Sequence, residues 1–275
     1  PMGYISRIMK RNPSVMERLR CFLDHQAAMY NVPEFADNDP VQFPRRFSRL
    51  EDREIVSLLC STIAWGNRKM ICRDCERLIG MMGGEPYEFL MDKAYEDLPD
   101  GNIHRTFFVE NLRRYMRGLR DIYAAHGSLQ GFARHIHISA SETPSWHLVA
   151  GLNQSICEAN GGVGDSRCLP QNLDSTALKR VNMALRWLVR NDGIVDMGCW
   201  DVIKPSQLFI PMDVHVGNQA RALGLLERKA NDRKAVMELT ALLRDFRPED
   251  PVVYDFALFG IGITGATPDL PDGIQ

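Results

Sequence analysis

LFIPMDVHVGNQARALGLL, residues 208–226, joins an apolar run closed by Pro211 to a segment with helical periodicity, and it places Asp213 at the junction. An aspartate in front of a helix can accept hydrogen bonds from the free N–H groups of the first turn, which stabilises the helix by about 1 kcal/mol. Asp213 therefore has an ordinary structural explanation, and a chemical role needs further support from the rest of the chain.

Helical periodicity extends outward from this segment over most of the sequence, whereas strand-like alternation is nearly absent. Pro33, Pro40 and Pro44 interrupt residues 31–47, which are predicted to form a long loop, and Ser48 with Glu51 suggests a capping box. Residues 161–174 form a second predicted loop. Helices are predicted over 13–31, 48–65, 66–82, 104–127, 128–137, 145–160, 175–192, 212–227, 232–246 and 248–265. The sequence thus predicts an all-α protein.

The bulk composition is that of a globular protein, with 275 residues, 45% hydrophobic and 25% charged, and a net charge of -2. No run of about eighteen apolar residues is present, and the N-terminus lacks the order of a secretory signal, so a cytoplasmic protein without a membrane partner is expected. Seven cysteines favour reduced thiols. The C-x-x-C at Cys72 and Cys75 has no second ligand pair, so no metal site is predicted.

The predicted helix 175–192 has two contrasting faces when it is drawn at 100° per residue. Apolar side chains share one face: Leu178, Val181, Ala184, Leu185 and Leu188. Polar and cationic side chains share the opposite face: Lys179, Asn182, Arg186 and Arg190. From the pattern alone, this second face is either an ordinary solvated surface or a cationic stripe that binds a partner.

The segment 210–226 resembles the catalytic aspartate segment of the helix-hairpin-helix DNA glycosylases, the superfamily of endonuclease III and 8-oxoguanine DNA glycosylase. VVYDFALFGIGITG, residues 252–265, lies where that superfamily has its closing helix. The chain as a whole is also similar to a little-characterised bacterial family assigned to this superfamily. The resemblance implies one two-lobed helical unit, with approximate lobes 47–160 and 13–46 plus 161–275.

Two motifs of the superfamily are missing. The usual hairpin L-P-G-V-G-x-x-T-A is replaced by GGVGDSRCLP at 161–170, which differs in order and spacing. The C-terminal cysteine cluster of endonuclease III is also missing, because the last cysteine is Cys199. The resemblance therefore implies a divergent hairpin, no iron–sulfur cluster and no other cofactor.

KRVNMALR, residues 179–186, is similar to the lysine-bearing helix of the archaeal 8-oxoguanine glycosylase, a variant whose hairpin is also divergent. The pattern K-x-(V/I)-x-(F/M)-A-(V/L)-(K/R) puts Lys179 in the place of the catalytic lysine. In that chemistry a carboxylate, here Asp213, stabilises the oxocarbenium-like charge on the sugar while the glycosidic bond breaks. The lysine amine attacks C1′ and forms a Schiff base, which permits strand cleavage.

Further candidates would contact DNA, because a damaged base must leave the stack and a side chain usually fills the gap. Trp65, Asn67 and Arg68 lie at a break between two predicted helices and are candidates for probing the duplex, although Trp65 is also explained as a core residue. Arg180, Arg186 and Arg190 are candidates for holding phosphates, with Asn182 and His215 as neighbouring polar candidates. The basic clusters FPRRFSRLEDR (43–53) and RRYMRGLR (113–120) either extend this surface or pair with nearby acids.

The leading functional hypothesis is a DNA glycosylase with AP-lyase activity on an oxidised purine such as 8-oxoguanine, acting on double-stranded DNA. The alternative is a nucleic-acid-binding protein of the same fold whose catalysis has been lost or changed. An unrelated helical metal phosphohydrolase of the HD type is disfavoured, because the chain contains no His-Asp dipeptide.

Overall fold

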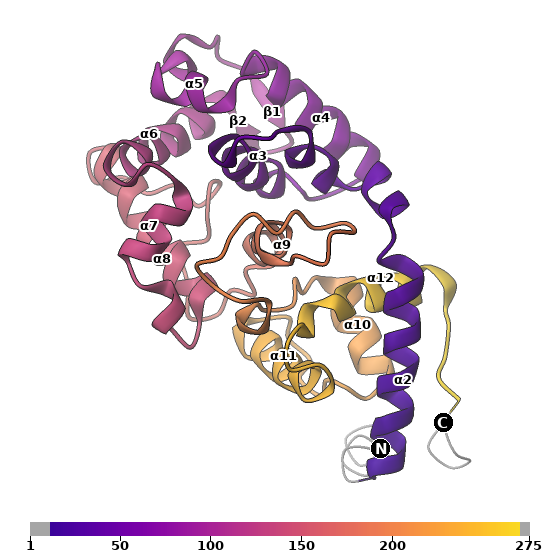
Figure 1. Ribbon diagram of the computed structural model, residues 1–275. Coiled ribbons are helices and arrows are strands. Elements are labelled where there is room, and N and C mark those ends of the chain that lie inside the picture. The colour runs from indigo at the N-terminus through magenta and orange to yellow at the C-terminus, as the bar shows by residue number, and fades with distance from the viewer. Residues whose placement is uncertain (1–11, 270–275) are drawn as a thin grey trace.

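Helices carry almost all of the regular structure in the computed structural model, which describes residues 12–269 (Figure 1). The α-helices are α2 (Pro13–Tyr30), α3 (Leu50–Thr62), α4 (Arg68–Met81), α5 (Pro86–Met91), α6 (Val109–His126), α7 (Leu129–His135), α8 (Pro144–Ala159), α9 (Lys179–Val189), α10 (Val214–Ala222), α11 (Arg233–Phe246) and α12 (Tyr254–Thr264). Short 3-10 turns are η1 (Pro33–Asn38), η2 (Pro40–Gln42), η3 (Pro44–Arg46), η4 (Ala94–Asp97), η5 (Ile138–Ala140), η6 (Pro205–Gln207) and η7 (Pro251–Val253). The all-α prediction is confirmed. No helix within the described range is both long and apolar enough to cross a membrane.

Several ends of the predicted helices are wrong; the helix expected from residue 248, for example, begins only at Tyr254. The helix expected from residue 104 begins only at Val109, because β1 (Asn102–His104) and β2 (Phe107–Phe108) form a small antiparallel hairpin in front of it. Ile103 and Phe107 are fully buried, so the hairpin is fixed by its apolar side chains. The expected capping box is also absent: α3 begins after Arg49, which makes no side-chain capping bond.

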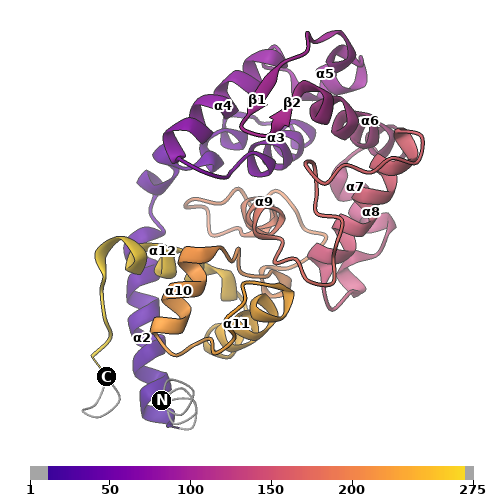
Figure 2. The ribbon, with the colours of Figure 1, turned by 180° about the vertical axis from the view of Figure 1, so that it is seen from behind.

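α9 lies at the centre of the molecule (Figures 1 and 2). α3, α4, α5 and the hairpin are grouped on one side of it, α10 to α12 lie on the other, and α6 to α8 flank both. The N-terminal α2 packs along the C-terminal α12, so the two ends of the described chain meet. α9 contacts α3 and α8, and the Arg186–Asp255 ion pair joins it to α12.

The long segment between α9 and α10, residues 190–213, folds back along α9. Met197 N donates to Trp187 O (2.8 Å), and Trp200 N donates to Leu188 O (2.8 Å). This return covers the side of α9 that other helices leave open. As a result, every residue from Val181 to Arg190 is buried, which is the pattern of an interior helix and not of a surface one.

Glu54 on α3 is a fully buried carboxylate that joins three parts of the fold. It accepts hydrogen bonds from Tyr123 Oη (2.9 Å), Trp200 Nε1 (2.8 Å) and the backbone N–H groups of Leu129 and Gln130 (both 2.9 Å). Burial raises the pKa of Glu54 to about 7, although these four donated bonds favour the charged form. The carboxylate therefore connects α3 with α6, with the start of α7 and with the segment after α9.

The raised pKa of Glu54 gives an expected dependence of stability on pH. A carboxyl whose pKa is higher in the folded state than in the unfolded state contributes stability at pH values below about 4.5, and this contribution is lost as the pH rises through about 7. Glu54→Gln removes the titration but also places an amide N–H₂ opposite hydrogen-bond donors. We expect a lower free energy of unfolding at every pH. The difference between the free energies of unfolding at pH 5 and at pH 7.5 should shrink by up to about 3 kcal/mol.

Urea unfolding of both proteins at the two pH values measures this effect. The exposed Glu158→Gln is the matched control and should leave the pH difference unchanged. An equal pH difference in Glu54→Gln and in the unaltered protein would show that Glu54 is ionised throughout this range.

Candidate functional site

Lys179 is the first residue of α9, and it follows a backbone turn of unusual conformation. Leu178, which precedes the helix, has φ 50° and ψ 35°, a left-handed conformation that is costly for a branched side chain. Leu178 itself is buried, whereas Lys179 is half-buried. The strained turn thus starts α9 so that the apolar residue points inward and the lysine remains accessible.

A cavity of about 290 Å³ opens beside this turn. Its apolar wall consists of Cys168, Leu169, Pro170, Ala177, Leu178 and Val181. Its polar groups come from Thr62, Thr176, Lys179, Arg180 and Asn231. None of these lining residues, all within the described range 12–269, is acidic. The volume is near the lower end of small-molecule sites, which span roughly 300–1,000 Å³.

Asp213 caps α10, as its position in the sequence suggested. Its Oδ1 accepts a hydrogen bond from Val216 N (2.9 Å), and the residue is half-buried. Asn231, which lines the cavity beside Lys179, donates from Nδ2 to the backbone oxygen of Asp213 (3.3 Å). Asn231 therefore links the segment that carries Asp213 to the cavity.

Asp255 on α12 lies in an environment that the lysine and the aspartate share. Burial raises the pKa of Asp255 to about 6; the Arg186 guanidinium lowers it, the Asp213 carboxylate raises it further, and the Lys179 ammonium lowers it. Such interactions weaken as the distance between the charges grows. The charges of Lys179 and Asp213 therefore both act on the same buried carboxyl group.

The cationic face predicted for α9 is not a surface. Arg186 is 3% exposed and donates from Nε to Asp196 Oδ1 (3.1 Å) and from Nη1 to Asp255 Oδ2 (2.5 Å). Arg190 is 1% exposed and pairs with Asp192 (2.6 Å), Asp196 (2.5 Å) and Asp250 (2.8 Å). This corrects the expected stripe, because both guanidinium groups are buried among carboxylates.

Asn182 is buried too, at 1% exposure, and it donates from Nδ2 to Ala177 O (3.1 Å). That bond closes the turn before α9 and helps to fix the start of the helix. Arg186 and Arg190 therefore anchor the second half of α9, and Asn182 anchors its first turn, through bonds within the protein.

Arg180 is the one arginine of α9 that borders the cavity. Its Nη1 donates to Thr62 O, and its guanidinium lies over the Trp65 ring, 5.2 Å from the centroid. Burial lowers the pKa of Arg180. The side chain is therefore held in a defined orientation between the end of α3 and the helix that carries Lys179.

The break after α3 brings two predicted residues next to this arrangement. Trp65 is half-buried and packs edge to face against His104 (4.7 Å between centroids), so it is partly a packing residue. Asn67 caps α4 by accepting hydrogen bonds from Lys69 N (3.0 Å) and Met70 N (3.3 Å). Both residues have structural roles, and the exposed Asn67 also remains open to a partner.

His104 anchors the hairpin beneath Trp65. Its two ring nitrogens face acceptors, Asp74 Oδ2 (2.7 Å) and Trp65 O (2.9 Å), and the side chain is fully buried. Both ring nitrogens of His104 are therefore engaged, one by a side chain of α4 and the other by the backbone at the α3–α4 break. The hairpin is thereby held against the α3–α4 break.

Four exposed cations surround this break, and we call them the basic rim: Arg68, Lys69, Arg105 and Arg167. Arg105 packs so closely on Gly66 that a Cβ at that glycine would lie 2.6 Å from Arg105 Nη1. Arg167 donates to Thr106 Oγ1 (2.9 Å), while Arg68 lies over the Phe259 ring (4.9 Å) and 3.9 Å from Asp39. The sequence had indicated only Arg68, because the hairpin and the loop that deliver the other two arginines carry no motif.

His215 lies on the exposed side of the first turn of α10, two residues after Asp213. Nothing in the described range holds it in place, and it is accessible to a ligand that approaches Asp213. The clusters 43–53 and 113–120 are different, because most of their arginines bond to nearby groups. Examples are Arg46 with Glu76 (2.7 Å), Arg49 with Glu88 (2.6 Å) and Arg117 with Glu96 (2.7 Å).

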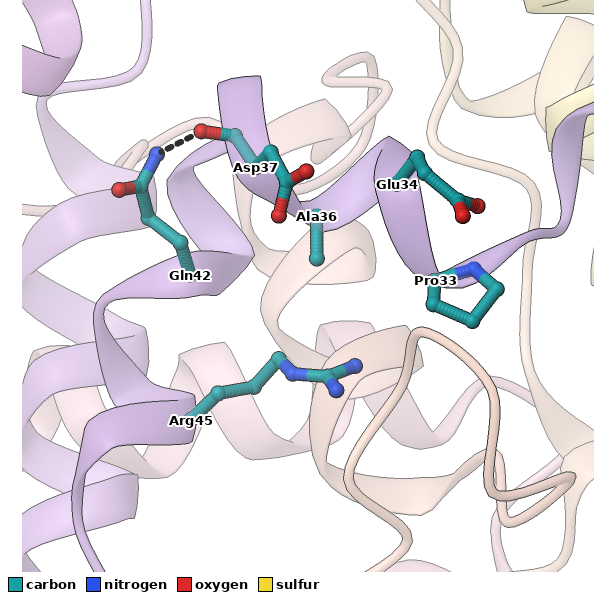
Figure 3. Close-up of a pocket in the computed structure, with 6 residues that line it drawn as sticks. All are labelled: Pro33, Glu34, Ala36, Asp37, Gln42 and Arg45. Atoms are coloured by element: carbon teal, nitrogen blue, oxygen red, sulfur yellow. Dashed lines mark hydrogen bonds between the residues drawn. The ribbon is translucent and has the colours of Figure 1, made fainter.

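A larger hollow of about 440 Å³ lies among η1, η2 and η3 (Figure 3). Arg45 extends across it and donates from Nη1 to the backbone oxygen atoms of Ile194 (2.9 Å) and Val195. None of the predicted site residues lines this hollow. The candidate site is therefore the smaller cavity beside Lys179.

Comparisons with known proteins give a family but no described activity. Neither the curated proteins nor the solved structures contain a match to this chain. One family model matches residues 39–264, a range that includes Lys179, Asp213 and the whole cavity lining. This match spans most of the sequence, so the chain belongs to the family described as Protein of unknown function (DUF2400).

Proposed function

We propose that the protein is a DNA glycosylase with AP-lyase activity, which removes an oxidised purine such as 8-oxoguanine from double-stranded DNA. One observation carries the proposal: Lys179 borders a cavity, and Asn231 in the same lining is hydrogen-bonded to the backbone oxygen of Asp213, which itself does not line the cavity. The reaction needs an amine and a carboxylate at one sugar carbon, and Lys179 and Asp213 are the residues proposed to supply them. The resemblance of segments 179–186 and 210–226 to glycosylase motifs supports the same assignment.

In the proposed reaction, the Nζ atom of neutral Lys179 attacks C1′ of the damaged nucleotide. The N-glycosidic bond breaks, and its electron pair leaves with the base, which takes up a proton. The sugar ring then opens to give an imine between Nζ and C1′, and loss of the C2′ proton expels the 3′ phosphate. Because Lys179 stands at the first position of α9, its side chain reaches the cavity without disturbing the buried part of the helix.

Asp213 would act during cleavage of the glycosidic bond. Its Oδ1 is occupied by Val216 N, which fixes the orientation of the carboxylate. A carboxylate held in this way stabilises positive charge that develops on the sugar without reorganising in the transition state. Capping and catalysis are compatible, since capping uses one carboxylate oxygen.

DNA would bind across the basic rim. Its side chains are exposed, and no carboxylate within residues 12–269 forms a direct ion pair with Lys69, Arg105 or Arg167. Cations without such partners can release counterions from DNA phosphates and so provide affinity. Trp65 and Asn67, which lie within the rim, are the candidates for contacting the gap left by an extruded base.

The test uses duplex DNA that contains either 8-oxoguanine or an abasic site. The protein is incubated with each duplex in the presence of sodium borohydride, which reduces the imine to a stable amine. A covalent protein–DNA band on a denaturing gel supports the lyase. Base release without a band would indicate a monofunctional glycosylase, and neither product on any lesion tested would refute the proposed activity. DNA binding alone would then favour the repurposed nucleic-acid-binding protein.

Asp213→Asn should separate the two chemical steps. Asparagine still caps a helix, so the fold is retained, but the lost charge should slow single-turnover release of 8-oxoguanine by about 10²–10³-fold. The adduct at an abasic site should persist, because no glycosidic bond has to break there. Asp232→Asn is the matched control, since Asp232 caps α11 in the same way, by accepting from Ala235 N (3.0 Å). Equal rates in the two variants would remove Asp213 from the mechanism.

A further inference from the structure

Arg180 is a half-buried cation without a counter-ion in the described part of the chain. The hydrogen bond of its guanidinium is to Thr62 O, an uncharged acceptor, and no carboxylate within residues 12–269 pairs with it. Its arginine neighbours on α9 differ, because Arg186 and Arg190 are both surrounded by aspartates. Withdrawing a charge from water without a partner is costly, so an unpaired guanidinium at a cavity favours a ligand that supplies acceptors.

The geometry restricts what that ligand can be. Thr62 O and the Trp65 ring fix the guanidinium plane, so its remaining N–H groups have a set direction. Both polar atoms of the Asn231 amide already have partners within the protein. Its Nδ2 donates to Asp213 O, and its Oδ1 accepts from Arg221 (2.6 Å). The charged groups that border the cavity, Lys179 and Arg180, are donors.

The apolar part of the wall favours a ligand with an apolar surface over a free phosphate. Leu169, Pro170, Ala177, Leu178 and Val181 provide apolar surface. A phosphate group would lose its hydration against these walls, whereas the ring of a nucleobase would be stabilised by them. A base with a ring carbonyl offers both an apolar ring and an acceptor edge.

We propose that Arg180 is the specificity-determining residue of this cavity, and that it selects 6-oxopurines by donating hydrogen bonds to O6. Guanine, 8-oxoguanine and hypoxanthine share this carbonyl group. Adenine and 8-oxoadenine carry an amino group at C6, which is a donor and would face the donors of Arg180. The arginine thus favours guanine-type bases and disfavours adenine-type bases, and this deepens the proposed glycosylase function by naming its substrate class.

The test has two arms, and the first does not depend on catalysis. Isothermal titration calorimetry of the whole protein with hypoxanthine and with adenine measures binding of the free bases. We expect hypoxanthine to bind about tenfold to hundredfold more tightly than adenine. Arg180→Lys keeps the charge but loses the planar set of donors, so it should reduce hypoxanthine affinity at least tenfold and remove the preference.

The second arm compares single-turnover release of 8-oxoguanine and 8-oxoadenine from duplex DNA, and it rests on the proposed function. Arg180→Lys should slow 8-oxoguanine release at least tenfold while the borohydride adduct at an abasic site, which has no base to read, forms as before. Lys234→Arg, an exchange between the same residue types at an exposed position of α11, is the control and should change nothing.

The outcomes separate the two proposals. Selective binding of hypoxanthine that depends on Arg180, without any adduct or base release, would support the cavity assignment and refute the glycosylase. An adduct together with equal binding of the two bases, binding of neither, or an unaffected Arg180→Lys would overturn the role of Arg180. Loss of the abasic adduct in Arg180→Lys would also overturn it, because the arginine would then position Lys179 and not read the base.

Discussion

In the proposed lyase reaction, Lys179→Ala will abolish the borohydride-trapped adduct with both abasic and 8-oxoguanine DNA. Among the residues that line the cavity, Lys179 supplies the only primary amine, and an imine cannot form at C1′ without it. Strand cleavage by elimination should disappear with the adduct. The fold should be retained, because Lys179 is half-buried at the first position of α9 and makes no buried ion pair in the described range.

Lys234→Ala is the matched control for this loss. Lys234 also lies in the first turn of a helix, α11, but it is exposed and does not border the cavity. The control variant should trap DNA as efficiently as the unaltered protein, and the two variants should have similar unfolding midpoints. If Lys179→Ala still forms the adduct at an undiminished rate, another amine is the nucleophile, and the assignment of Lys179 fails.

Local features of the fold could be predicted because short stretches of sequence determine them. The first helix, predicted for 13–31, is α2 at Pro13–Tyr30, where proline at the first position sets the start. Asp213 caps α10 because an acceptor side chain directly precedes an apolar helical repeat. In both cases the neighbouring residues are sufficient to determine where the helix begins, and no contact with a distant residue is required.

The environment of α9 could not be predicted from its own pattern. Arg186 and Arg190 resemble the polar face of a surface helix, yet residues 190–213 fold back over that face and bring Asp192 and Asp196 with them. Asp250 and Asp255, which also pair with these arginines, belong to the C-terminal part of the sequence. The helical pattern shows which side chains of α9 are charged. It does not show whether carboxylates from distant parts of the chain will pair with them in the interior.

The basic rim was missed for a related reason. Arg105 is carried by a two-residue connection between very short strands, and it adopts φ 49°, a conformation for which an arginine gives no sequence signal. Arg105 lies beside Gly66 because Ile103 and Phe107, on either side of it in the chain, are buried in the core. The candidate lysine and aspartate were therefore accessible to motif comparison, whereas the surface proposed to bind DNA required the tertiary structure.

Asp196→Ala will destabilise the fold by about 3–5 kcal/mol, because it leaves two buried guanidinium groups with less charge compensation. Asp196 is 3% exposed and is bonded to both Arg186 (3.1 Å) and Arg190 (2.5 Å). Burial raises the pKa of this carboxyl, and the two arginines oppose the rise. Chemical unfolding at pH 7 measures the loss as a lower midpoint at an unchanged slope.

Asp201→Ala is the control, since Asp201 also pairs with an arginine, Arg134, but both side chains are exposed, at 80% and 57%. Exposed ion pairs contribute about 0–1 kcal/mol, so this variant should unfold close to the unaltered protein. A similar small loss in Asp196→Ala would mean that water or the remaining acids, Asp250 and Asp255, compensate both arginines. A large loss would instead establish that the buried ion pairs at the C-terminal end of α9 depend on the segment that folds back between the two candidate catalytic residues.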